Sequence, residues 1–396
     1  MANTALTSMQ VTRKALQVLH QKLNFVGAIT REYDDRFAND GAKIGDTLKI
    51  RLPNQYVVTS GATLVTQDTS ESSIDLKINS QKHVGMNFTS QDLTLSLDDF
   101  SDRIIEPAMA VLAAAVESDA LSMYKDVYQQ ANNLGTAASF AKVLAGRKIL
   151  VDALTPPGSR TVCLNTQDNV DMVADLKGLF NPQERLAKMV TEGYLGRTAG
   201  FDFNENTFLS KFTGGTENGS SATITINGSG QTGATLTVTN GSAKTLLRGD
   251  IVTLPGVNRV HPETKADTGV AQQFVVTADL ATSGTQLSIS PAIVTSGATQ
   301  NVTASPTTAQ TVTKTGTASQ AYGISLAFHK QAFAFATADL VMPKGVDFGA
   351  REVFDGISLR IVRQYDINND KLPCRVDILY GYKTIRPQLA CRLANN

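Results

Sequence analysis

Apolar residues recur at helical spacing in two parts of the chain. Within residues 11–31, Leu16, Leu19 and Leu23 fall three and four residues apart, which places them on one stripe of an amphipathic helix. Within residues 98–132 the apolar positions keep steps of three, four and seven, which predicts one long packed helix. Pro107 is expected in its first turn, where the missing N–H removes no helical hydrogen bond.

The spacing of apolar residues changes to every second position between residues 41 and 90. Ile74, Leu76 and Ile78 alternate with polar residues, and a second alternating run follows. This period is that of β-strands with one apolar face. Because residues 56–73 contain few apolar side chains, we expect an extended hairpin that protrudes from the body and lies on a neighbour.

The middle of the chain mixes helical and strand patterns. We expect a helix at 139–154, a buried strand at 161–164 and a second helix from Asp168, which together indicate an α/β or α+β domain. Strand patterns return at 323–335 and 359–389. A polar turn is expected at 365–372, between two of these strands.

Between these two parts the composition changes sharply. Residues 216–320 contain 23 threonines, ten charged residues and a single aromatic residue, Phe274. Alternating runs such as 222–226 and 234–238 are separated by Asn-Gly and Ser-Gly dipeptides. We interpret this segment as a separately inserted β domain, built as a small barrel or sandwich.

Two short motifs resemble ligand sites, but their contexts favour turns. Residues 228–233 match G-x-G-x-x-G, yet they lie between two Thr-rich strands instead of between a strand and a helix, so a hairpin turn is expected. Asp366, Asn368 and Asp370 imitate the start of a calcium loop, but Lys371 takes the position that requires glycine. We interpret both as structural turns.

Charge and composition narrow the function further. The chain has 36 Lys and Arg against 36 Asp and Glu, and its longest basic run is Arg147-Lys148, which argues against strong nucleic-acid binding. The longest apolar run, 108–116, is far shorter than the roughly 20 residues of a membrane span. With no basic-then-apolar leader and three cysteines in no C-x-x-C pair, we expect an unexported protein with reduced thiols.

The sequence shows no catalytic pattern. The four histidines are scattered, and neither a G-x-S-x-G elbow nor a phosphate-binding P-loop is present. We therefore predict no catalytic, cofactor-binding or metal-binding residue and no enzyme activity.

One cluster of charge stands out within the charge-poor insert. Four of its ten charged residues fall inside nine positions, 259–267. They form either an exposed solvated loop or a tip that makes salt bridges with another subunit, where charge complementarity fixes register. The predicted hairpin carries further charged residues of this kind. The candidate intersubunit contacts are Arg259, Glu263, Lys265, Asp267, Arg51, Asp75 and Lys77.

The order of the parts, together with three segments, resembles a known family. The segments are EGYLGRTAGFDFNEN (192–206), ISLAFHKQAFAFATADL (324–340) and VDILYGYKTIRPQLACRL (376–393). They resemble the major capsid protein of tailed bacteriophages, the Hong Kong 97-type fold, and within it the short-tailed phage branch with an inserted β-barrel. With the arm and hairpin the likeness covers some 290 residues, while the insert matches only in position, size and β character.

The resemblance implies an α+β fold divided into named parts. These are an N-terminal arm (1–40), an extended β loop (41–92), the spine helix of the peripheral domain (93–134), the axial domain (135–213 and 322–356), the inserted β domain (214–321) and C-terminal peripheral strands (357–396).

The resemblance also implies a function and partners. Copies would form the hexamers and pentamers of an icosahedral shell that encloses double-stranded DNA without binding it tightly. A portal protein would occupy one vertex, and a separate scaffolding protein is expected because only about ten residues precede the arm helix. The virion would be assembled in the bacterial cytoplasm. The insert would stabilise the subunit and bridge capsomers through residues 259–267, and no covalent crosslink is predicted.

Three alternatives stay open at this point. An encapsulin-like compartment would use the same architecture to hold enzyme cargo, although a Thr-rich insert argues against it. A surface adhesin or binding module built on the insert would suit the threonine content, but the missing leader weighs against export. An enzyme ranks last, for want of a recognisable site.

Overall fold

The computed structural model describes residues 12, 15, 17, 19, 23–31, 47–59, 61, 62, 64, 66, 67, 71–89, 106–176, 196–209, 211–346, 348–354 and 356–396. The chain forms two compact units. The first combines Met1–Leu52, Ser73–Leu121 and Phe333–Ile385, and the second combines Pro53–Ser72, Ser122–Ala332 and Arg386–Asn396.

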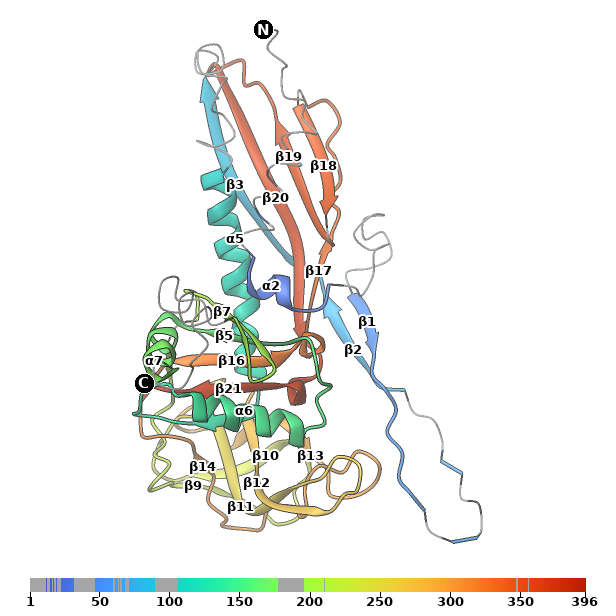
Figure 1. The fold of residues 1–396 in the computed structure, drawn as a ribbon, viewed down its shortest axis with the longest axis vertical. Coiled ribbons are helices and arrows are strands. Elements are labelled where there is room, and N and C mark those ends of the chain that lie inside the picture. The colour runs from blue at the N-terminus through green and yellow to red at the C-terminus, as the bar shows by residue number, and fades with distance from the viewer. Residues whose placement is uncertain are drawn as a thin grey trace. The chain divides into compact units, whose positions relative to one another are not determined.

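The first unit is built on a sheet of long antiparallel strands. Strand β20 (Lys371–Thr384) pairs with β17 (Phe333–Ala338), β19 (Ile357–Arg363) and β3 (Ser80–Thr89), and β18 (Phe348–Phe354) pairs with β19. Alternate residues are buried in the first part of β20, up to Val376, and helix α5 (Glu106–Leu121) packs along β3 (Figure 1). The polar turn predicted between β19 and β20 is present, closed by a bridge between Asp366 and Lys371.

The helix predicted over 98–132 is shorter than its apolar pattern suggested. Helix α5 ends at Leu121 and is followed by a 3-10 turn, η2 (Ser122–Asp126), and a short strand, β4 (Gln130–Asn132). Met123 and Val127 continue the helical spacing and are buried, but in irregular structure. Beyond Leu121 the apolar spacing therefore indicates which residues are buried, but it does not indicate a helix. Pro107 is the second residue of α5 as described, and residues 98–105 lie outside the described residues.

The predicted arm helix is interrupted. Residues 12, 15, 17 and 19 are helical, Leu23 and Asn24 are not, and α2 (Phe25–Ala28) follows as a single turn. The buried carboxylate of Glu117 in α5 accepts hydrogen bonds from the backbone N–H groups of Phe25 and, at 3.2 Å, Val26. One side chain thereby binds the first turn of α2 to α5.

The predicted hairpin exists but is smaller than expected. Strands β1 (Thr47–Arg51) and β2 (Ser73–Lys77) pair in antiparallel register, whereas the second alternating run, β3, pairs with β20 over its full length. The prediction had placed β3 in the protruding hairpin. Its alternation has the same period, but its partner lies almost 300 residues away in the sequence, and short-range spacing carries no information about such a partner.

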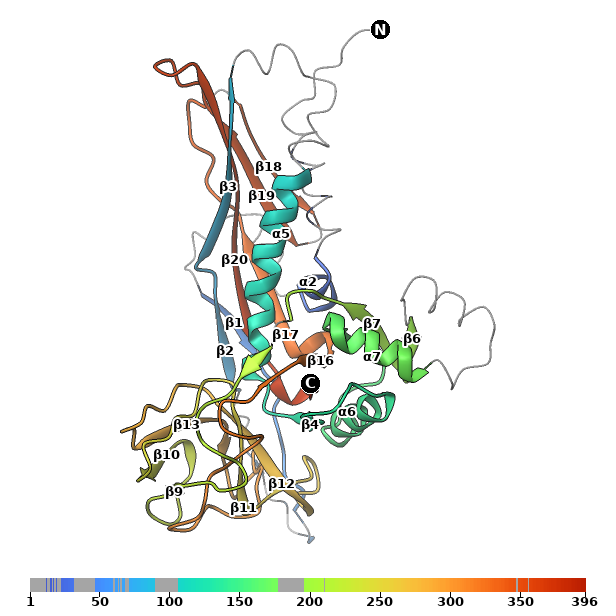
Figure 2. The same ribbon diagram turned by 90° about the vertical axis from the view of Figure 1, so that its left-hand side faces the viewer.

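The second unit holds a mixed sheet covered by two helices. Its strand order is β4, β21 (Ala390–Ala394), β16 (Ile324–His329), β5 (Arg160–Leu164), β7 (Phe201–Glu205) and β6 (Arg197–Thr198). Helix α6 (Phe140–Asp152) packs on β21 and β4, and α7 (Thr166–Leu176) lies near it (Figure 2). The predicted helices and the buried strand of this region are confirmed, with small shifts at their ends.

The inserted segment folds as a closed antiparallel barrel. Its strands are ordered β14 (Thr313–Lys314), β11 (Ile251–Val260), β12 (Asp267–Val276), β13 (Gln286–Ile293), β10 (Gly233–Asn240) and β9 (Ile224–Ile226). The ring closes because the chain just before β14 pairs with β9: Ile226 N–H donates to Gln310 O at 2.8 Å, and Val312 N–H donates to Ile224 O at 2.9 Å. The barrel-like domain is thus confirmed, and residues 228–233 form the hairpin turn between β9 and β10.

Candidate assembly surfaces

The β1–β2 hairpin has one apolar face, which is packed against its own unit. Leu48 lies opposite Leu76 and Ile50 opposite Ile74. These four side chains contact Ala334, Ala336 and Ile385. The base of the hairpin is therefore held by an ordinary hydrophobic contact, in which the side chains of its second face take no part.

The second face of the hairpin is charged and exposed. Lys77 lies opposite Thr47, Asp75 opposite Lys49, and Arg51 opposite Ser73. The structure thus brings the three predicted residues Arg51, Asp75 and Lys77 onto one face. Lys49, which the sequence analysis missed, joins them and gives the face three cations against one carboxylate. The period-two pattern of residues 47–51 was the signal that could have revealed it.

The chain that joins the two strands exposes large apolar side chains. Tyr56 is 58% exposed, Val58 90% and Leu64 85%. The amide of Gln67 accepts from Val57 N–H at 2.9 Å and donates to Val57 O at 2.5 Å, so that it holds the outgoing and returning segments together. Several large apolar side chains exposed on one segment are typical of a surface that another protein covers.

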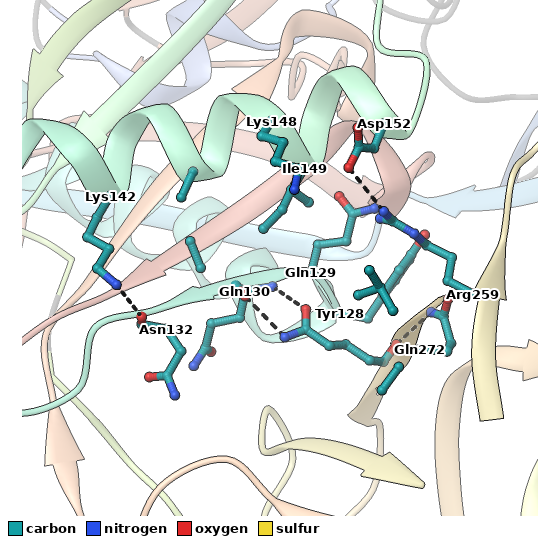
Figure 3. A pocket seen from close by; sticks show the side chains of 15 residues that line it. Tyr128, Gln129, Gln130, Asn132, Lys142, Lys148, Ile149, Asp152, Arg259 and Gln272 are labelled. Carbon is teal, nitrogen blue, oxygen red and sulfur yellow. Dashed lines mark hydrogen bonds and ion pairs between the residues drawn. The ribbon is translucent and has the colours of Figure 1, made fainter. Parts of the chain in front are cut away.

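The predicted charged cluster lies at the end of the β11–β12 hairpin, and one of its members faces inward. Arg259 Nη2 donates to Asp152 Oδ2 of α6 at 3.2 Å, and the Arg259 side chain is only 19% exposed (Figure 3). Arg259 therefore joins the barrel to α6 within the subunit. The sequence pattern could not distinguish this contact from one with another subunit.

The other three members shape the turn or point outward. The backbone N–H groups of Glu263 and Thr264 donate to His261 Nδ1, and Lys265, at φ 59°, donates from Nζ to Gln300 O at 3.3 Å. Burial lowers the pKa of Lys265. The backbone N–H of Gly269 and the side chain of Asn258 hold the pKa of Asp267 below its ordinary value. The Glu263 side chain is exposed.

A cleft of about 320 Å³ lies between α6, β4 and the strands β11 and β12 (Figure 3). Two of the charged side chains that line it are bound within the subunit: Lys142 Nζ donates to Asn132 O at 3.3 Å, and Arg259 pairs with Asp152. No nucleophile with an adjacent base lines it within the part of the chain that the structure describes. The cleft lies along the seam where the barrel docks on α6 and β4.

No helix among the described residues is both long enough and apolar enough to span a membrane. No three His, Cys, Asp or Glu side chains gather there in a group that could hold a metal ion.

The family model described as "P22 coat protein - gene protein 5" matches residues 38–392. No protein of curated function matches the sequence.

Similar solved structures include a chain of Mycobacterium phage Che8, 13% identical, with a TM-score of 0.48 over 94% of this chain and 90% of that one. The mature capsid of bacteriophage PhiM1 is 9% identical, with a TM-score of 0.44 over 89% and 83%. A virus-like particle from Pyrococcus furiosus is 8% identical, with a TM-score of 0.41 over 97% of each chain.

Proposed function

Because the chain belongs to the P22 coat protein family, it is a structural protein of a phage capsid shell, and we propose that its copies form the hexamers and pentamers of an icosahedral shell around double-stranded DNA. Its α+β architecture, with a long helix, a long-stranded sheet and an inserted barrel, is the Hong Kong 97-type fold predicted from the sequence. The family's role implies a non-enzymatic protein that associates with copies of itself and resides in the virion.

The observation that carries the proposal is the contrast between the two faces of the β1–β2 hairpin. The apolar face packs against the subunit's own core, while Lys49, Arg51 and Lys77 on the other face are exposed. The segment beyond the strands adds the exposed apolar side chains of Tyr56, Val58 and Leu64. The charged face would fix register and the exposed apolar side chains would supply buried area; each suits contacts that are repeated between identical subunits.

The barrel loop 259–267 supplies a second proposed contact, with fewer residues than the sequence suggested. Arg259 is engaged with Asp152 of its own chain. Glu263, with Lys265 and Asp267 beside it, is left as the charged end of the β11–β12 hairpin. We propose that this charged end bridges capsomers. Arg259 would hold the β11–β12 hairpin in place on α6.

The parts of the subunit and its partners complete the proposal. We assign residues 41–92 to the extended loop, 93–134 to the spine, 135–213 and 322–356 to the axial domain, and 214–321 to the inserted domain. A scaffolding protein and a portal protein are the expected partners during assembly in the host cytoplasm. The absence of net charge supports a container that encloses DNA without binding it tightly.

The proposal is tested by assembly. Expressed with its scaffolding protein, the chain should give uniform closed particles by negative-stain electron microscopy, and a product of monomers and dimers alone would contradict it. Lys77→Glu should lower the yield of particles, while Lys211→Glu, which reverses an exposed cation outside the hairpin, should not. Equal yields from the two variants would remove the hairpin face from the assembly contacts.

A further inference from the structure

The short strand β4 forms one edge of the mixed sheet in the second unit. Its strand neighbour is β21: Arg392 N–H donates to Gln129 O at 2.8 Å, and Asn133 N–H donates to Ala394 O at 2.9 Å. Because backbone groups alternate sides along a strand, the N–H and C=O groups of Gln130 and Asn132 point away from β21. An edge of this kind is a template on which a strand from another chain can pair.

A side chain of the barrel occupies this edge. The Oε1 atom of Gln273 in β12 accepts the N–H of Gln130 at 2.8 Å, and its Nε2 atom donates to the C=O of Gln130 at 3.1 Å (dashed lines at Gln130 in Figure 3). A residue on an adjacent antiparallel strand exchanges the same two bonds with its partner. One amide side chain therefore makes the pairing that a strand would make.

A second side chain extends the closure. Lys142 of α6 donates from Nζ to the C=O of Asn132 at 3.3 Å. Three of the four outward groups of Gln130 and Asn132 are thus bound, two of them by the barrel and one by α6. The barrel therefore closes the edge at Gln130, and the helix binds its C=O group at Asn132, which is exposed.

The barrel is held in place for this task by contacts that involve charged side chains. The buried guanidinium of Arg392 donates from Nη1 to Gly249 O at 2.8 Å, and Arg248 Nη2 lies 2.8 Å from Asp126 Oδ1. Among the described residues the barrel and the mixed sheet share no strand. Gln273 therefore meets β4 in a fixed position although no backbone pairing aligns the two sheets.

We infer that the barrel protects this edge from pairing: Gln273 occupies the hydrogen-bonding groups that a neighbouring strand would use, and it thereby prevents β4 from pairing with a strand of a second copy of the chain. This role goes beyond that of a coat subunit. It is complete within one subunit, so its test needs no assembled shell, and its failure would leave the proposed function standing.

The test compares Gln273→Ala with Gln231→Ala in the isolated full-length subunit. Gln231 is a matched control, because its side-chain amide also accepts from a backbone N–H and donates to a backbone C=O. Both of these groups belong to Thr237, within the barrel domain itself. By hydrogen exchange, the Gln130 amide should exchange about tenfold faster in Gln273→Ala, as expected for loss of its bond. The Asn133 amide, which is bonded to β21, should keep its rate. Gln273→Ala subunits should also associate on warming, measured by light scattering, while Gln231→Ala and unmodified subunits should not.

Two results would overturn the inference. Unchanged exchange at Gln130 in Gln273→Ala would mean that Gln273 does not close the edge. Faster exchange without association would mean that the open β4 edge does not pair with a second copy of the chain. If Gln273→Ala fails to fold, Gln273→Glu keeps the acceptor for the Gln130 N–H and loses the donor to its C=O. It should give a smaller acceleration of exchange and slower association, and behaviour identical to the unmodified subunit would contradict the inference.

Discussion

Reversing the charge at Arg259 distinguishes a contact within the subunit from one between subunits. The structure pairs Arg259 with Asp152 at 3.2 Å, with the two side chains 19% and 39% exposed. Solvent screens such a pair, so its loss should cost about 1 kcal/mol, at the upper end of the range for exposed ion pairs. Arg259→Glu replaces attraction by repulsion of similar size and should lower the free energy of unfolding by about 2 kcal/mol.

The assay is urea unfolding of isolated subunits, arranged as a double-mutant cycle with Asp152→Arg. By the same reasoning Asp152→Arg should also cost about 2 kcal/mol, whereas the double variant restores opposite charges in reversed order and should be close to the unmodified subunit, about 4 kcal/mol above the sum of the two single changes. In about 1 M salt the Debye length falls to about 3 Å, so the coupling should shrink. A purely packing-based effect would not depend on salt in this way.

Two outcomes would refute this reasoning. Strictly additive single changes would show that the two side chains do not interact in solution. A variant Arg259→Glu whose isolated subunit unfolds normally, but which fails to build particles, would place the partner of Arg259 on another subunit and restore the interpretation first drawn from the sequence.

Three further changes test other parts of the structure. In Gly381→Ala the new Cβ would overlap the carbonyl oxygen of Lys77, so stability should fall by about 2 kcal/mol, while Gly85→Ala on the same sheet, with open space at its Cβ, should be tolerated; melting temperatures decide. Glu117→Gln keeps the shape but replaces one of the two acceptor oxygens by an NH2 group, so one backbone hydrogen bond is lost and the other loses its charge; the change should cost about 2 kcal/mol in urea unfolding. Burial, aided by two nearby arginines, lowers the pKa of His329 below 6.5; the unfolded chain therefore takes up a proton first, and stability should fall as the pH drops below that value. His329→Asn should remove this dependence between about pH 8 and about pH 5, and an unchanged pH profile would contradict it.

The sequence predicted elements best where one period governed a whole segment. Helix α6 and strand β5 lie close to their expected places because burial and hydrogen bonding there have the same period. After Leu121 burial still follows the helical spacing, but the backbone hydrogen bonds no longer do. Met123 and Val127 are buried at helical spacing, but the chain has already left the α-helix and goes on to pair with β21 through β4. A tertiary hydrogen-bonding partner overrode the local pattern, and the pattern contained no trace of that partner.

The polar contacts that define the surfaces were beyond prediction for a related reason. Arg259 and Asp152 are 107 residues apart in the sequence, and Gln273 and Gln130 are 143 apart. Each side chain by itself is compatible with a solvated surface, and its role depends on a partner that only the fold supplies. The hairpin face differs, because alternation within β1 and β2 alone decides which residues share it; Lys49 could have been included by that rule.

The closed ring of the barrel explains why its joint is made of side chains. Residues 309–314 pair with β9 on one side and with β11 on the other, so each described strand of the barrel has a strand neighbour on both sides. It can attach only through side chains, through the backbone of turns such as that at Gly249, and through close packing. Gly249 has φ 101°, and a Cβ there would meet the ring of Phe212, so the turn that accepts the Arg392 guanidinium requires glycine. A domain that lacks edges of its own is well suited to cover the edge of another sheet, because it can close β4 without offering a new template in its place.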